Sequence, residues 1–111
     1  KVKSILATTN QTNNFKTTPK VIIKTVSEFY DIKEEDLINQ SRKREIVLPR
    51  QICMYLMREE LKNSYPFIGD KFGGRDHTTV MHACEKITKE LQVNENLTEE
   101  LNVIKNRIYE A

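Results

Sequence analysis

The sequence contains no tryptophan, and only three of its 111 residues are glycine, three are proline and two are cysteine. No apolar run approaches the roughly 20 residues that a membrane-spanning helix requires, and we find no secretory signal peptide. The cysteines, Cys53 and Cys84, are too few and too far apart for a disulfide framework or a zinc site. We therefore expect two reduced thiols in the core.

The length is sufficient for one domain with a single modest core. The composition, 38% apolar and 31% charged, is typical of a soluble globular chain. Because the chain begins at Lys1 rather than methionine, we expect it to be a piece of a longer protein.

The net charge is only +2, but the charges are unevenly distributed. No acidic residue precedes Glu28, whereas five lysines do. Residues 42–50 carry four basic side chains against one acidic, and residues 95–111 carry four acidic against two basic. A basic middle and an acidic end predict one face that attracts phosphate.

Residues 7–18 are rich in threonine and asparagine and show no apolar period, which predicts a linker. We assign residues 1–18 to a flexible linker or the end of a preceding domain, and residues 19–111 to a folded domain. Thr18 followed by Pro19 is a typical helix start, with an N-cap residue and a proline at the first helical position.

Apolar residues recur at helical spacing beyond the linker, and no segment alternates with period two for long enough to indicate a strand. This pattern predicts an all-α fold in which the helix after Pro49, with its wide apolar stripe, is central. The helices are predicted from Pro19 over about a dozen residues, at 34–39, from Pro49 to about Asn63, from Pro66 to Gly73, after Asp76, and over the C-terminal segment. Between the second and third helices we predict a basic loop at 41–48.

The most informative stretch is residues 73–84. Its two glycines tolerate the positive φ of a tight turn, and Asp76 then occupies the N-cap of a helix. The buried stripe of that helix begins at Val80, so the polar residues before it project at the helix tip. This arrangement suits the turn and recognition helix of a helix-turn-helix DNA-binding protein. The tip residues are His77, Thr78 and Thr79.

Each of these side chains has a chemistry that suits base edges. Histidine can donate or accept, and a threonine methyl can touch the methyl group of thymine. Asp76 can accept from a cytosine amino group or simply cap the helix. Lys86, later on the same helix, can reach a phosphate or remain a solvated surface lysine.

Other basic residues allow two interpretations. Gln51 and Arg58 are seven residues apart and share one face of the preceding helix, and Arg50 lies near its start, where backbone N–H groups favour anions. A solvated helix face would look the same. The triplet 42–44 is either solvated loop charge or a flexible segment that inserts Arg42 into the minor groove.

Enzymatic interpretations fit poorly. His77 and His82 are five residues apart, about 140° around a helix, and cannot share a metal without distortion. Asp76, His77 and Thr78 are sequence neighbours that do not face one another on a helix. The chain also has no phosphate-binding glycine loop with lysine. We expect neither catalysis nor a bound metal.

Residues 72–84, together with the segment Leu48–Gln51, closely resemble the signature of the C-terminal DNA-binding domain of the DnaA family of bacterial replication initiators. The resemblance extends from about Thr18 to Ala111. It implies a helix-turn-helix domain that binds short, mostly A/T-rich boxes in double-stranded DNA at the replication origin, in the cytoplasm on the nucleoid. The family's ATP-binding AAA+ module lies upstream, and its motifs are missing here. The resemblance thus implies no cofactor in this chain, with that ATPase domain and regulatory proteins as further partners.

The resemblance also assigns roles to individual positions. Arg42 matches a minor-groove arginine, Arg50 and Gln51 match phosphate-contacting positions, and Arg58 matches a basic contact residue. The remaining DNA-binding positions lie on the two helices flanking the turn, and in the turn itself: Pro66, Arg75, Asp76, His77, Thr78, Thr79 and Lys86. Tyr65 and Phe67 depart from the family pattern, which leaves the contacts of the first short helix open.

Two other functions remain compatible with the sequence. One is a helical protein-interaction module whose exposed helix tip binds a partner. The other is a transcriptional regulator of the same architecture, which does not exclude an initiator because an initiator can also repress promoters that contain its boxes. The glycine turn, the polar tip and the nearby basic segment favour DNA binding.

Overall fold

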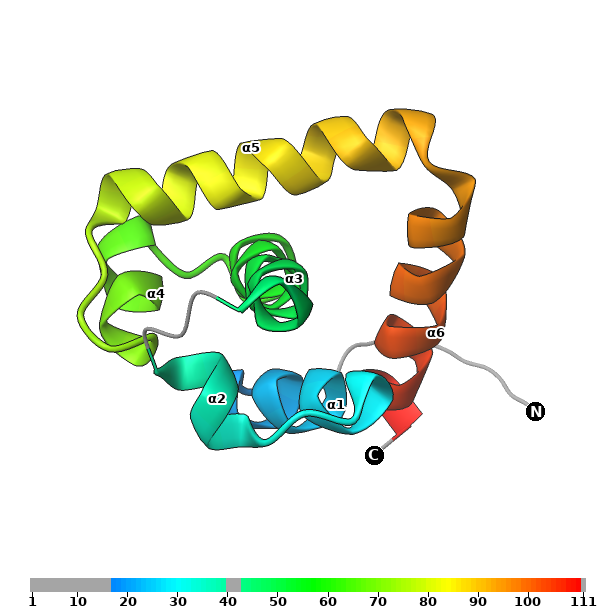
Figure 1. The fold of residues 1–111 in the computed structure, drawn as a ribbon, viewed down its shortest axis with the longest axis horizontal. Helices are drawn as coiled ribbons and strands as arrows, with labels where there is room; N and C mark the ends of the chain where they lie inside the picture. Colours follow the sequence, from blue (N-terminus) through cyan, green and yellow to red (C-terminus); the bar gives the residue numbers. More distant parts are fainter. Residues whose placement is uncertain (1–16, 40–42, 111) are drawn as a thin grey trace.

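The computed structural model describes residues 17–39 and 43–110, and all regular elements in this part of the chain are α-helices (Figure 1). This confirms the predicted all-α class. The six helices are α1 (Pro19–Tyr30), α2 (Glu34–Ile38), α3 (Arg44–Glu60), α4 (Tyr65–Lys71), α5 (His77–Val93) and α6 (Glu95–Glu110).

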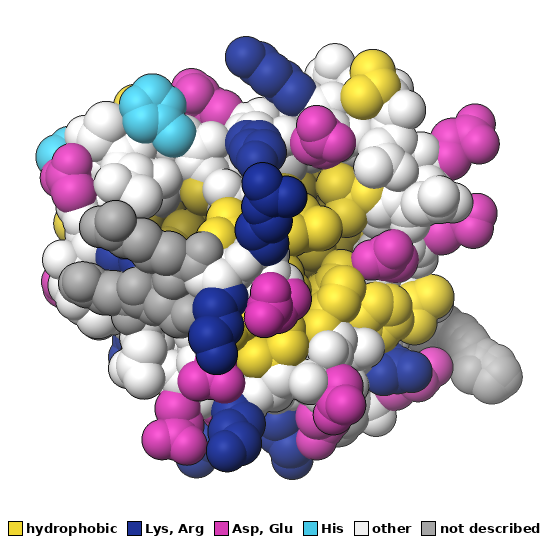
Figure 2. All heavy atoms as spheres, viewed as in Figure 1, with side chains coloured by type: hydrophobic (Ala, Val, Ile, Leu, Met, Phe, Trp, Pro, Cys, Tyr) yellow, Lys and Arg dark blue, Asp and Glu magenta, His cyan; other side chains and the backbone are white. Residues whose placement is uncertain are grey.

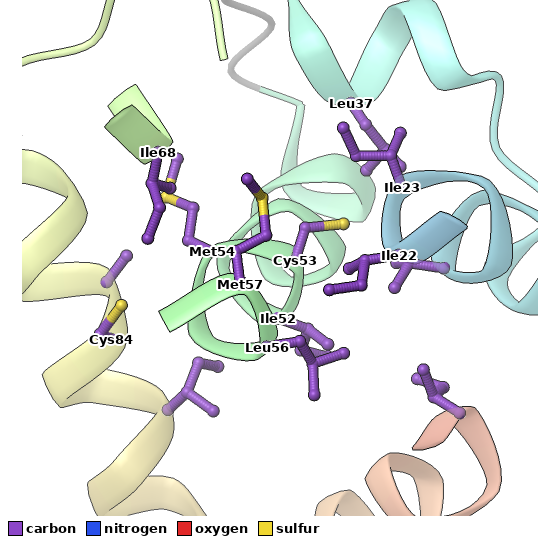
Figure 3. Packing of buried hydrophobic residues seen from close by; sticks show 14 of the residues in the cluster. Ile22, Ile23, Leu37, Ile52, Cys53, Met54, Leu56, Met57, Ile68 and Cys84 are labelled. Atoms are coloured by element: carbon purple, nitrogen blue, oxygen red, sulfur yellow. The ribbon is translucent and has the colours of Figure 1, made fainter. Parts of the chain in front are cut away.

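The helix α3 lies at the centre of the domain, and the other helices surround it (Figure 1). It packs against α1, α2, α4 and α5, whereas α6 closes the side between α1 and α5. Figure 3 shows why: side chains leave α3 in several directions, with Met54 and Met57 toward α4 and Cys53 toward α1 and α2. The prediction of a central helix is confirmed.

Two helices, α1 and α4, begin with a side-chain cap, and the cap at Thr18 was predicted from the sequence. The Thr18 hydroxyl accepts a hydrogen bond from the Val21 amide at 3.2 Å, and the Ser64 hydroxyl accepts one from the Phe67 amide at 3.2 Å. Each satisfies an amide that has no partner within the helix. Pro19 directly follows its cap, and Pro66 lies two residues after Ser64. Both prolines are in the first helical turn, where the missing N–H costs no helical hydrogen bond.

The predicted start of α3 was wrong. The helix begins at Arg44, so most of the expected basic loop is helical and Pro49 lies inside the helix. Ile46, Arg50 and Cys53 are buried on one face of this helix, so extending it toward the N-terminus buries Ile46. That burial offsets the one backbone hydrogen bond that Pro49 cannot donate.

The predicted end of α3 was also slightly too late. The helix ends at Glu60, because Lys62 adopts the left-handed region with φ of 57°. The Asn63 amide then donates to the Met57 carbonyl at 3.2 Å and closes the end of the helix.

The turn between α4 and α5 sets the angle between these two helices. Gly73 and Gly74 have φ of 80° and 76°, which confirms the predicted conformation. The carbonyl of Gly69 accepts three backbone amides of the turn, from Phe72, Gly74 and Arg75, at 3.1, 3.1 and 2.9 Å. Gly69 is buried within α4, and a side chain there would overlap the Arg75 carbonyl oxygen.

Both cysteines are free and buried, as predicted. Burial raises the pKa of the Cys84 thiol to about 11, and it also raises the pKa of the Cys53 thiol. At pH 8 only roughly one Cys84 thiol in a thousand is therefore ionised, and the thiolate is the reactive form.

We expect a thiol-specific disulfide reagent to label neither cysteine of the native protein within minutes at pH 8, and both after addition of guanidinium chloride. Absorbance of the released chromophore measures this directly. Rapid labelling of one thiol in the native protein would show that the core around it is open.

None of the helices in the described part of the chain combines the length and the apolar character that crossing a bilayer requires.

Candidate nucleic-acid interface

The first turn of α5 forms an exposed polar tip. It consists of His77, Thr78 and Thr79, and it is followed at once by the fully buried Val80. The buried residue anchors the helix in the core, so the three polar residues before it stand at the edge of the domain. The side chains of Asp76 and His77 are 64% and 61% exposed and thus accessible to a partner.

Asp76 occupies the N-cap position of α5, but its side chain makes no capping hydrogen bond. The carboxylate oxygen Oδ1 instead lies 3.3 Å from Nδ1 of His77. The prediction that Asp76 caps the helix is therefore correct for the position and wrong for the hydrogen bond. A carboxylate that is not used as a cap retains its capacity to accept hydrogen bonds from a ligand.

A groove of about 370 Å³ runs between α3 and α5. It brings together five predicted DNA-binding positions from three parts of the chain: Arg50, Gln51, Arg75, Thr79 and Lys86. The other lining residues are Val47, Met54, His82 and Ala83. Its base is partly apolar, and its polar groups include three cationic side chains.

Two buried polar atoms of groove residues have no hydrogen-bond partner. They are Oε1 of Gln51, an acceptor, and Nε of Arg75, a donor. A buried polar atom left without a partner costs free energy, and such atoms are rare in folded proteins. Both atoms are therefore suited to bind a polar ligand that enters the groove.

Figure 2 shows how charge is arranged on one face of the domain. Lys and Arg side chains follow one another from the edge of α5 across this face to the edge formed by α1 and α2. A histidine lies beside them on α5, and Asp and Glu lie on the side of α6, beside the band itself and along the edge of α1 and α2. This face therefore carries a basic band with acidic side chains beside it, and the single phosphate-attracting face expected from the sequence stays a prediction.

Arg50 lies in the groove but is only 6% exposed. Its Nε donates to the Leu37 carbonyl at 3.0 Å and its terminal Nη2 to the Asn39 carbonyl at 2.9 Å. The expected phosphate contact remains a prediction, but this side chain also has a folding role that the sequence did not reveal.

Arg58 and Pro66 lie apart from this groove. The Arg58 guanidinium donates to the Asn63 carbonyl at 3.0 Å and stacks over the Tyr65 ring, 4.4 Å from its centroid. It lines a second groove, which is formed with α4 and the opposite flank of α5. Pro66 is exposed on the first turn of α4. Arg42 lies outside the described residues.

Sequence reasoning considered His82 only as a metal ligand. In the structure it is a groove residue, and its ring nitrogen Nδ1 lies 3.6 Å from a carboxylate oxygen of Glu85. Thr79, His82 and Lys86 recur at spacings of three and four, which places them on one helix face. That spacing was the signal that could have identified His82. Among the described residues, no three His, Cys, Asp or Glu side chains are grouped to hold a metal.

Comparison with known proteins identifies the same part of the chain. The family model for the bacterial DnaA protein helix-turn-helix matches residues 19–87. The chain is 47% identical to the chromosomal replication initiator protein DnaA of Chloroflexus aggregans over 89 residues. These residues make up 80% of this chain and 19% of that protein.

The chromosomal replication initiator protein DnaA of Crocosphaera subtropica is 47% identical over 90 residues, covering 81% of this chain and 20% of that protein. A crystal structure of a DNA replication initiation factor superposes with a TM-score of 0.74 at 26% identity, covering 83% of this chain and 28% of that one. The chain spans about a fifth of the length of the curated relatives it matches.

Proposed function

Because the chain belongs to the family of bacterial DnaA helix-turn-helix domains, we propose that it binds double-stranded DNA at short A/T-rich boxes of a bacterial replication origin. The observation that carries this proposal is the exposed polar tip of α5, set by the double-glycine turn and flanked by a cationic groove. In a helix-turn-helix protein, the N-terminal residues of the recognition helix reach base edges in the major groove.

The tip residues supply the base contacts. His77 can donate to or accept from a base edge, and the methyl groups of Thr78 and Thr79 suit the thymine methyl groups of an A/T-rich box. Asp76, which makes no cap bond, accepts from a cytosine amino group on the same side of the helix.

The groove residues position the duplex. Lys86 and Arg75 supply positive charge, and Gln51 supplies a side-chain amide whose own buried oxygen, Oε1, lacks a partner. A phosphate oxygen beside these groups would accept from Nε of Arg75. Contacts of this kind set affinity and register and carry no sequence information themselves.

Arg42 supplies a second contact with base edges, in the adjacent minor groove. It follows α2 by a few residues and precedes α3, whose start lines the α3–α5 groove. A narrow A/T-rich minor groove has an enhanced negative potential that attracts arginine.

The binding proposal is tested by fluorescence anisotropy with two labelled duplexes, one with an A/T-rich origin box and one with the same bases scrambled. We expect the box duplex to bind roughly a hundredfold or more tightly at 150 mM salt. Equal affinity for the two duplexes would exclude sequence-specific binding. No affinity for either duplex would instead favour the protein-interaction module.

Replacing Arg42 with alanine should weaken binding to the A/T-rich box by about 1–2 kcal/mol, and much less when the base pairs at the box end are changed to G·C. Lysine should restore only part of the loss, since ammonium is more strongly hydrated than guanidinium. The measurement is a double-mutant cycle between the protein and DNA changes. If the two losses are strictly additive, Arg42 does not sense that groove.

For the whole protein we propose an upstream AAA+ module that binds ATP, assembles the initiator and opens the duplex, with this domain bringing it to the origin on the nucleoid. The relatives are about five times longer than the matched segment, which leaves room for such a module. Regulatory proteins are further proposed partners.

A further inference from the structure

Two aromatic residues at the start of α4 each have a cation over the ring. The guanidinium carbon of Arg58 lies 4.4 Å from the centroid of the Tyr65 ring, and Nζ of Lys71 lies 5.2 Å from that of Phe67. Arg58 and Tyr65 are both half-buried, whereas Phe67 and Lys71 are exposed. A cation–π contact is stronger where the cation is partly removed from water. The contact between Arg58 and Tyr65 is therefore the stronger of the two.

Arg58 is also held by the backbone. It lies in the last turn of α3, and its Nη1 donates to the Asn63 carbonyl at 3.0 Å, in the connection to α4. Its Nε and Nη2 make no hydrogen bond within the described part of the chain. Because a guanidinium group is planar and carries several N–H donors, one edge can be held by the protein while another edge binds a ligand.

The second groove, which surrounds this pair, has a volume of about 470 Å³. Its lining includes two basic residues, Arg58 and Lys89, and two acidic residues, Glu59 and Glu85. The α3–α5 groove is instead lined by three cations and no carboxylate. An anion is thus not drawn into the second groove by an excess of positive charge. Binding there depends on a donor that is already held in the right orientation.

The place of this pair in the fold suits a DNA backbone. In a helix-turn-helix protein the first helix crosses the backbone while the second enters the major groove. Here α4 is the first of these helices, and Arg58 and Tyr65 meet at its start. The two grooves lie on opposite flanks of α5. With the tip of α5 in the major groove, these flanks would face the two strands that border it.

We propose that Tyr65 is a positioning residue for DNA binding: its ring holds the Arg58 guanidinium so that the unused donors meet a backbone phosphate. The proposal rests on the proposed DNA-binding function. The family resemblance implies a basic contact at Arg58 and gives Tyr65 no role. A free arginine side chain loses much conformational freedom when it binds, whereas one that is already held by a ring and a carbonyl loses less.

The test measures affinity for the box duplex and the scrambled duplex at several salt concentrations, at a temperature where circular dichroism shows every variant folded. Tyr65→Leu removes the ring and should bind both duplexes roughly fivefold more weakly. Its slope of log affinity against log salt should stay unchanged, because Arg58 keeps its charge. Tyr65→Phe keeps the ring and should bind like wild type. Arg58→Met should flatten the slope by about one.

A double-mutant cycle identifies the route of the effect. Once Arg58→Met is present, Tyr65→Leu should cost little further affinity, because the ring acts through the guanidinium. Phe67→Leu is the matched control, because it removes the other ring with a cation over it from the same helix. Its effect on affinity should be the same with and without Arg58→Met. If Tyr65→Leu does not fold, Tyr65→Met takes its place in the cycle.

A readout without DNA separates this proposal from the binding proposal. The side-chain Nε–H resonance of Arg58 should move in free Tyr65→Leu, because the ring current is lost, and should stay in place in Tyr65→Phe and Phe67→Leu. A wild-type chain that binds both duplexes equally would refute sequence-specific binding alone, and one that binds neither would refute both proposals.

Four results would overturn the positioning role while leaving the binding proposal intact. They are equal losses from Tyr65→Phe and Tyr65→Leu, strict additivity of Tyr65→Leu with Arg58→Met, an unmoved Arg58 resonance in Tyr65→Leu, and an unchanged salt slope in Arg58→Met.

Discussion

Gly69→Ala is expected to destabilise the domain by about 3 kcal/mol, although alanine is normally the better residue inside a helix. The added methyl group would overlap the Arg75 carbonyl oxygen, and that oxygen belongs to backbone that cannot rotate away. Relief requires the turn to move away from α4. The three hydrogen bonds that the Gly69 carbonyl accepts from backbone amides of the turn would then lengthen.

Thermal denaturation followed by circular dichroism measures the effect, which for a domain of this size corresponds to a Tm roughly 15 °C lower. Gly74→Ala is the matched control, because no atom lies within 4 Å of a side chain added there. Its φ of 76° should still cost about 1 kcal/mol, and Gly74→Val should cost more. A Gly69→Ala variant as stable as wild type would show that α4 and the turn are not closely apposed.

His77→Ala is expected to lower affinity for the A/T-rich box by about 1–3 kcal/mol while leaving affinity for scrambled DNA nearly unchanged. The imidazole is exposed at the first turn of α5, so its removal would delete the proposed base contact and leave the core intact. Loss of a base contact reduces discrimination between sequences, whereas loss of a phosphate contact weakens all sequences alike.

Anisotropy titrations against both duplexes measure the change in discrimination. His82→Ala is a matched control, because it removes the same ring from the same helix at a groove position one turn beyond the tip. We expect that control to change both affinities by similar, smaller factors. Equal weakening on the two duplexes by His77→Ala would contradict a base-reading role.

Local signals in the sequence were sufficient for much of the fold. The cap at Thr18 and the glycine pair each act within about four residues, so their chemistry can be read directly. The wide apolar stripe of α3 likewise predicted its central place, because an apolar face on several sides requires neighbours on several sides. The exposed polar tip of α5 followed from the same logic.

Contacts between segments decided the rest. The sequence indicated neither that Gly69 lies against the Arg75 backbone nor that burial of Ile46 extends α3 past Pro49. The partners of Arg50 are thirteen and eleven residues away, so in the sequence it resembled a solvated cation near a helix start. Helical periodicity determines which face of a helix is buried, whereas the packing of α2, α3 and the turn determines which polar groups meet there.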